Sequence, residues 1–155
     1  MQAWNTLKNG LDGFHTTGAK VPAFFDAQGA LLLARTSRCA EALALVDEAI
    51  SQMTQTGEAA HLAEVYRLKG EILLLFPGEH QAEAKQAFEL ALEVSRAQQA
   101  KSWELRAAIS LASLLQLQGK RSEAREVLAP VYRWFTEGFD TNDLRQAKAL
   151  LESLS

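Results

Sequence analysis

The sequence has little of what marks a secreted or membrane-spanning protein. Among its 155 residues there is one cysteine, Cys39, which has no second cysteine to pair with and therefore fits a reducing cytoplasm. The longest apolar runs, Gly29–Ala34 and Ile72–Phe76, are far shorter than the ~20 residues that a membrane-spanning helix needs. The opening MQAWNTLKNG lacks the charged and apolar regions of a signal peptide. These absences predict a soluble, cytoplasmic chain with no membrane partner.

Neither sign of charge prevails in the sequence. The 16 Lys and Arg residues are interspersed with 19 Asp and Glu residues, which gives a formal net charge of −3. A mildly acidic chain without a basic block is a poor nucleic-acid binder, so we predict no nucleic-acid partner. With 48% hydrophobic residues, a chain of this length can form one domain that needs neither a disulfide nor a metal for stability.

Catalytic and cofactor signatures are missing as well. The sequence has no P-loop G-x-x-x-x-G-K-[ST], no G-x-G-x-x-G, no G-x-S-x-G elbow, no C-x-x-C and no H-E-x-x-H. The three histidines stand far apart in the chain, at His15, His61 and His80. Arg35 and Arg38 near Cys39 would favour a reactive thiolate, but a small residue at a helix start is the favoured interpretation of this cysteine. We predict a protein that is not an enzyme and that has no metal or cofactor.

Proline is also scarce, whereas helix-forming residues are abundant. The chain has three prolines and is rich in Ala, Leu, Glu, Gln, Lys and Arg, and no stretch alternates in the manner of a strand. Turn signals divide it into eight predicted helices of an all-α fold. Their ranges are Gln2–Thr16, Pro22–Ala34, Cys39–Gln55, Ala59–Phe76, Gln81–Gln98, Ser102–Gln118, Ser122–Thr136 and Asn142–Ser153. Ser122 and either Asp140 or Thr141 are the predicted N-caps of the last two.

A pattern of a small, a large and a second small residue, spaced four and three apart, recurs about every 40 residues. Its copies are Ala42, Val46 and Ala49; Ala84, Phe88 and Ala91; Ala124, Leu128 and Val131; and, more weakly, Ala3, Leu7 and Gly10. Each copy is followed by a stop, at Gly18, Gly57, Gln99 and Gly138. The helices before the last three copies carry Gly29, Gly70 and Ala112 at matching places. Small residues allow close helix contact, so we predict antiparallel helix pairs stacked into a solenoid.

These repeats divide the chain into one domain, 1–155, with distinct ends. Residues 1–17 would be an orphan second helix, 22–57, 59–99 and 102–138 three helix pairs, and 140–155 a capping helix. The orphan helix has an apolar stripe, and we expect two copies of the chain to form a homodimer through it. In the capping helix, Asp143 lies opposite the apolar stripe that contains Leu144. Trp134, Phe135 and Phe139 are predicted to pack between the array and this cap.

The AEAKQAFELAL segment, with Gly70 in the partner helix, resembles the tetratricopeptide repeat. YRLKGEILL is similar to the first helix of that repeat, although Tyr66 stands in place of the usual Trp. The closing proline is absent, and the period exceeds the roughly 34 residues of that family.

A longer resemblance covers nearly the whole chain. AEVYRLKGEILL, SWELRAAISLASLLQLQGKRSEAREVLAPVY and WFTEGFDTNDLRQAKALL resemble the C-terminal helical-repeat region of bacterial signalling proteins that also carry a nucleotide cyclase domain and a P-loop ATPase domain. The residues of those two catalytic domains have no counterpart here. The resemblance therefore implies a right-handed superhelical solenoid in a bacterial signalling protein. Its partner would be a protein, a peptide or another domain of the parent chain.

In tetratricopeptide repeats the first helix of each pair lines a concave groove. Positions matched from Gly70 and Ala112 place Leu74, Ile109 and six polar residues in such a groove. The six are the candidate partner-binding residues Glu64, Arg67, Glu71, Arg106, Ser113 and Gln116. The two arginines are favoured, because a guanidinium can hold a carboxylate with two hydrogen bonds. The alternatives are a solvated helix face and, for the function, a regulatory module that senses a small ligand in this groove.

Overall fold

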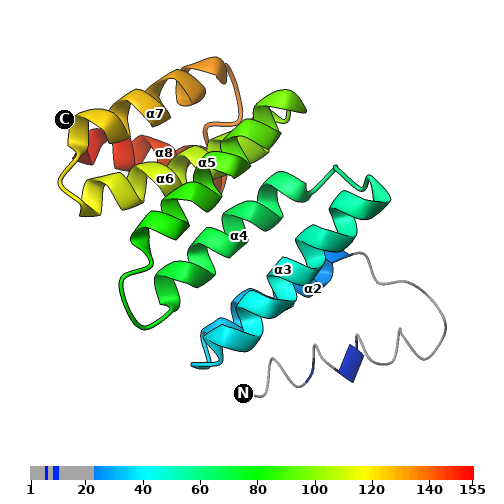
Figure 1. The fold of residues 1–155 in the computed structure, drawn as a ribbon. Helices are drawn as coiled ribbons and strands as arrows, with labels where there is room; N and C mark the ends of the chain where they lie inside the picture. The colour runs from blue at the N-terminus through cyan, green and yellow to red at the C-terminus, as the bar shows by residue number, and fades with distance from the viewer. Residues whose placement is uncertain (1–5, 7–8, 11–22) are drawn as a thin grey trace.

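The computed structural model describes residues 23–155 together with residues 6, 9 and 10 (Figure 1). In this part of the chain every regular element is a helix, and no strand occurs. The seven helices are α2 (Ala23–Ala34), α3 (Cys39–Thr56), α4 (Leu62–Leu75), α5 (Gln81–Ala97), α6 (Lys101–Leu117), α7 (Arg121–Trp134) and α8 (Asn142–Ser153). The predicted all-α class is confirmed for these residues. The helix predicted over Gln2–Thr16, with its expected dimer contact, lies almost wholly outside them.

The observed helix ends lie close to the predicted ones, but the caps differ. Ser122 was expected to cap α7, whereas α7 begins one residue earlier, with Lys120 at the N-cap and no side-chain cap. Thr141 does occupy the N-cap of α8, but its hydroxyl donates to the carbonyl of Gly138 at 2.7 Å. Cys39 begins α3 as predicted, and its buried thiol lies 3.4 Å from the carbonyl oxygen of Leu75.

The helices stack in chain order as antiparallel neighbours (Figure 1). Helices α2, α4, α6 and α8 contact one another in sequence, and α3, α5 and α7 each pack against the two even-numbered helices beside them in the chain. Among the described helices, α3 does not contact α5, and α5 does not contact α7. The result is one continuous layer of even-numbered helices covered by odd-numbered helices that stand apart from each other.

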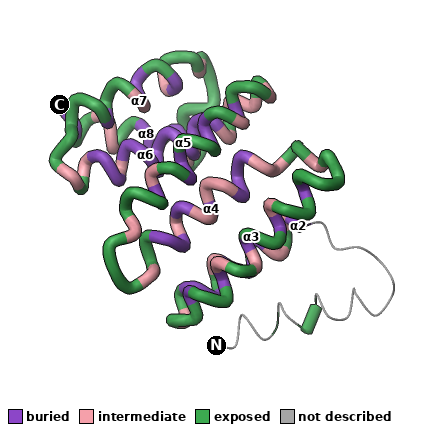
Figure 2. The backbone as a smooth tube through the Cα atoms, viewed as in Figure 1, coloured by how far each residue is buried: buried purple, intermediate pink, exposed green. Residues whose placement is uncertain are grey.

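The repeated small residues lie at the helix contacts. Ala42, Ala84 and Ala124, which open the last three copies of the pattern, are all fully buried. The large residues of the same copies, Val46, Phe88 and Leu128, are fully buried too. Buried residues follow the inner side of each helix, while the outer sides are exposed (Figure 2).

The core consists of two adjoining clusters of buried side chains. One lies between α2, α3 and α4 and includes Val65, Leu68 and Ile72 of α4. The other runs from α4 to α8 and includes Leu73 of α4. Helix α4 therefore supplies buried side chains to both clusters, and the half-buried Leu43 of α3 packs against both.

The closest helix approach occurs where Gly70 of α4 meets Phe88 of α5. A Cβ atom added to Gly70 would lie 2.3 Å from the Cε1 atom of the Phe88 ring, well inside contact distance. The ring is fully buried and cannot move aside without disturbing its neighbours. The predicted packing of a large side chain against a small residue of the partner helix is therefore confirmed for this pair. In the next helix pair, the larger Ala112 takes the place of Gly70 and the smaller Leu128 takes the place of Phe88. Both residues are buried.

We expect Gly70→Ala to lower the free energy of unfolding by about 1–3 kcal/mol, because the added methyl overpacks the contact with Phe88. Adding Phe88→Leu should recover part of this loss, since the double variant has the residue combination that occurs at Ala112 and Leu128. Urea unfolding of the two single variants and the double variant would measure the coupling. Strictly additive losses would contradict the close contact.

The turns after α5 and α6 end their helices in the same way, although only the one after α6 has a glycine. Gly119 after α6 has φ 76°, and Gln99 after α5 has φ 54°. In each turn the residue that follows donates its backbone N–H five residues back, from Ala100 to Ser95 and from Lys120 to Leu115, at 2.9 Å. This is the Schellman pattern, whose left-handed position favours glycine. Gln99, the only predicted stop that is not a glycine, thus adopts a glycine-like conformation.

Gln99→Gly should raise the free energy of unfolding by about 0.5–1 kcal/mol, because relief of the left-handed strain exceeds the entropic cost of glycine. The control is Ala97→Gly at the exposed last residue of α5, which should lower it by about 1 kcal/mol. Thermal unfolding of both variants checks the opposite signs. A loss of stability in both would refute the assignment of Gln99 as the left-handed cap.

Candidate functional site

A network of charged side chains joins three of the even-numbered helices. It starts in α4, where Glu64, Arg67 and Glu71 are spaced three and four residues apart and so share one helix face. The Nε and Nη2 atoms of Arg67 donate to the two carboxylate oxygens of Glu64, each at 2.8 Å. The Nη1 atom of Arg67 donates to Oε1 of Glu71 at 3.1 Å. The guanidinium therefore bridges both carboxylates of its own helix.

Helices α6 and α8 complete the network. Nη1 of Arg106 lies 2.9 Å from Oε1 of Glu64, and the hydroxyl of Ser110 donates to Oε1 of Glu71 at 2.7 Å. On its other side, Nε of Arg106 lies 3.5 Å from Oδ2 of Asp143 in the first turn of α8. Arg106 thus connects the buried carboxylate of α4 with a carboxylate of α8.

Burial differs strongly within this network. The side chain of Glu64 is 1% exposed and that of Arg67 13%, whereas Arg106 and Asp143 are 36% and 37% exposed. A buried carboxylate is tolerable only when opposite charge and hydrogen bonds replace water, and both arginines supply them to Glu64. Burial alone would lower the pKa of Arg67, but hydrogen bonding and charge from Glu64, followed by the charge of Glu71, raise it above its ordinary value. The network therefore has a closed, structural end at Glu64 and an accessible end at Arg106.

Aromatic rings continue this face toward the beginnings of the helices. The guanidinium carbon of Arg106 lies 5.4 Å from the ring centroid of Trp103, a cation–π contact. The Trp103 ring is edge-on to His61 at 6.0 Å, and His61 stacks on Phe24 of α2 at 4.4 Å. The half-buried rings thus form a row from α2 to α6 that ends at Arg106.

Four of the six predicted site residues come together in the network, and two lie elsewhere on α6. Ser113 is half-buried. Gln116 donates its Nε2 atom to the hydroxyl of Ser153 at 2.8 Å, which links α6 to α8. The prediction that the six bind a partner stays a prediction.

Sequence reasoning missed Ser110 and Asp143. Ser110 stands four residues after Arg106 on the same face, so its spacing was a usable signal. Asp143 was assigned to the polar back of the capping helix, opposite Leu144, but it faces Arg106. The orientation of α8 on α6 places it there, and the pattern within α8 alone does not contain that orientation.

Of the three aromatic residues predicted to pack between the array and α8, the half-buried Phe135 does pack against the core cluster that reaches α8, whereas Trp134 and Phe139 differ from expectation. Trp134 is 58% exposed and Phe139 47% exposed, so they are not a buried layer between the array and α8. Helix α7 ends at Trp134, and the extended backbone of Phe135 leads the chain away from the helix axis there. Phe139 contacts Tyr132 edge-on at 5.9 Å, and Nζ of Lys101 lies 5.6 Å from the Trp134 ring centroid.

Comparison with known proteins assigns no family. No family model matches the chain, and no curated protein matches it. Within the described residues, no group of three or more His, Cys, Asp or Glu side chains is arranged to hold a metal ion. None of the described helices is long and apolar enough to cross a membrane.

We expect Arg67→Met to lower the free energy of unfolding by about 3 kcal/mol. The Glu64 carboxylate stays buried in this variant but loses the two hydrogen bonds that Arg67 donates to it. The matched control is Arg38→Met. Arg38 also pairs with a glutamate three residues away, but both side chains are exposed, so stability should barely change. Chemical denaturation of both variants gives the comparison, and equal effects would contradict a structural role for Arg67.

Proposed function

We propose that this chain is a non-enzymatic helical-repeat domain that binds a protein partner, or couples domains of a signalling protein, through the face of α4, α6 and α8. We further propose that its helix pairs form a right-handed, tetratricopeptide-like superhelix, and that the partner is a protein, a peptide or another domain of a bacterial parent chain. The sequence resemblance supports the second proposal. The first rests on the open end of the charged network at Arg106.

The observation that carries the proposal is the position of Arg106 between Glu64, Asp143 and Trp103. Its guanidinium is oriented by two carboxylates and an aromatic ring, and it is still 36% exposed. Preorganised, partly exposed arginines beside aromatic rings are the kind of residue that dominates binding energy at protein interfaces. Arg67 differs, because its donors are used by Glu64, Glu71 and Ser110. We therefore assign partner contact to Arg106 and a structural role to Arg67.

A small-ligand sensor that uses the same groove has weaker support. Such a ligand would need free hydrogen-bonding groups, whereas the donors of Arg67 and the amide of Gln116 are already bonded within the protein. A protein partner needs fewer free donors, because it can contact the row of rings at Phe24, His61 and Trp103.

Site-specific photo-crosslinking tests the proposal. With a photoreactive residue in place of Ser113 on α6, we expect one discrete crosslinked partner in cells that carry the parent gene. The same residue in place of the exposed Glu126 on α7, outside this face, should give none. Adding Arg106→Ala should abolish the Ser113 product while circular dichroism stays unchanged. Equal products from both positions, or no discrete product at Ser113, would refute the proposed interface.

A further inference from the structure

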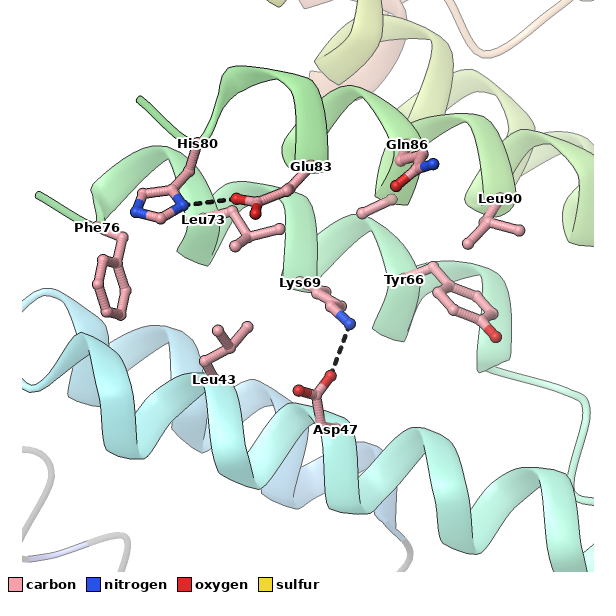
Figure 3. Close-up of a pocket in the computed structure, with 11 residues that line it drawn as sticks. Leu43, Asp47, Tyr66, Lys69, Leu73, Phe76, His80, Glu83, Gln86 and Leu90 are labelled. Atoms are coloured by element: carbon pink, nitrogen blue, oxygen red, sulfur yellow. Dashed lines mark hydrogen bonds and ion pairs between the residues drawn. The ribbon is translucent and has the colours of Figure 1, made fainter. Parts of the chain in front are cut away.

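A cleft of about 310 Å³ lies between α3 and α5, with α4 as its floor (Figure 3). On α4 it is lined by Tyr66, Lys69 and Leu73, and Phe76 lines it directly after the end of that helix. At 100° per residue the three α4 positions lie on the opposite side of the helix from Glu64, Arg67 and Glu71. The cleft is therefore separate from the charged network and opens between two odd-numbered helices that do not contact each other.

The next junction shows that such a cleft is not a necessary result of the repeat. Matched from Gly70 and Ala112, the positions of Tyr66 and Lys69 correspond to Ala108 and Leu111 of α6. Ala108 and Leu111 are buried, at 0% and 3% exposure, whereas Tyr66 and Lys69 are half-buried. Helix α5 also contacts α6 more extensively than α3 contacts α4. The cleft thus reflects side chains particular to this junction.

Most of the cleft wall is apolar. Carbon surface comes from three sides, contributed by Leu43 of α3, Leu73 of α4 with Phe76 just after it, and Ala87 and Leu90 of α5 (Figure 3). Its volume lies at the lower end of the range for small-molecule sites, which combine such walls with a few polar groups. A short aliphatic or aromatic body suits these dimensions, and a whole helix does not.

The polar groups of the cleft are two pairs with a shared asymmetry. Lys69 and Asp47 point toward each other across the gap between α4 and α3, with Nζ and Oδ1 2.7 Å apart (Figure 3). His80 and Glu83 pair on the α5 side, with Nδ1 and Oε2 2.5 Å apart. In each pair the nitrogen-bearing side chain is the more buried, at 31% against 50% and 29% against 59%. A ligand anion can replace either carboxylate, because the displaced side chain is exposed enough to be hydrated by solvent.

The next junction again gives the contrast. Glu89 of α5 corresponds to Asp47 of α3, but the α6 residue that corresponds to Lys69 is Leu111. Glu89 pairs instead with Lys85 of its own helix, at 3.6 Å. Only at the α3–α4 junction, among the described ones, does a lysine on the floor face the opening.

We propose that this cleft binds a small amphipathic carboxylate. Its carboxylate takes the place of Asp47 on the ammonium of Lys69, and its apolar body lies between Leu43, Leu73 and Leu90. This site does not depend on the partner-binding face, so the two proposals fail or succeed separately.

Isothermal titration with decanoate, kept below micelle-forming concentrations, tests the proposal on the full chain. We expect saturable binding that weakens about tenfold or more in Lys69→Met, because a charge-assisted hydrogen bond is lost. Asp47→Asn should strengthen binding several-fold, since it removes the competing carboxylate. Lys85→Met, the same substitution at a lysine outside the cleft, should leave binding unchanged. The neutral analogue decan-1-ol should bind more weakly than decanoate to the unmodified protein.

Three results would each overturn the proposal. They are the absence of saturable decanoate binding to the folded unmodified protein, equal affinity for decan-1-ol and decanoate, and weaker binding in Asp47→Asn. Ala87→Leu narrows the cleft and so tests whether decanoate binds there. Undiminished affinity in this variant, with its fold confirmed by circular dichroism, would also overturn the assignment. Arg106→Ala should leave decanoate binding intact, which separates this experiment from the crosslinking test.

Discussion

The architecture depends on how closely two paired helices can approach. Where Gly70 faces Phe88, the space of a missing side chain is filled by an aromatic ring, which leaves no room for even one more carbon. Larger residues at the small positions would push the helices apart, and the contacts between successive pairs would change with them. The fully buried alanines at 42, 84 and 124 extend the same constraint along the chain. The walls of the cleft and most of the charged network lie on helices that belong to these closely packed pairs.

The charged network adds orientation to this packing. Apolar contacts between even-numbered helices tolerate some sliding, but the carboxylate of Glu64 has to meet guanidinium groups from both α4 and α6. Arg106 transmits the same requirement to α8 through Asp143. A buried carboxylate with partners on two helices thus specifies one relative position of those helices, which an apolar residue of the same size would not. The accessible end of the network is held in place by this same requirement.

Much of the fold could be predicted from the sequence, because its determinants are local. The turn at Gln99 followed from its alignment with glycine stops, and the contact between Gly70 and Phe88 from the repeated pattern. The candidate site was harder to predict. Spacing placed Arg67 on one face with Glu64, but the bond from Arg106 to Glu64 depends on the stagger between α4 and α6. The surface position of Trp134 depends on α7 ending where it does, and the cleft depends on α3 and α5 standing apart. None of these distances between elements is contained in the periodicity of a single helix.

The sharing of α4 between two core clusters has a consequence for the energetics of the chain. Val65, Leu68 and Ile72 pack with α2 and α3, while Leu73 belongs to the cluster that continues to α8. In a linear array, stability is a sum of unit and nearest-neighbour terms, so a weak junction permits one part to open before the other. The α3–α4 junction is packed less extensively than the α5–α6 junction and contains the cleft, so partial opening costs less free energy at α3–α4 than at α5–α6. The binding free energy of a molecule in that cleft would add to the stability of the α3–α4 junction. The two segments on either side of the junction would then unfold together as one cooperative unit.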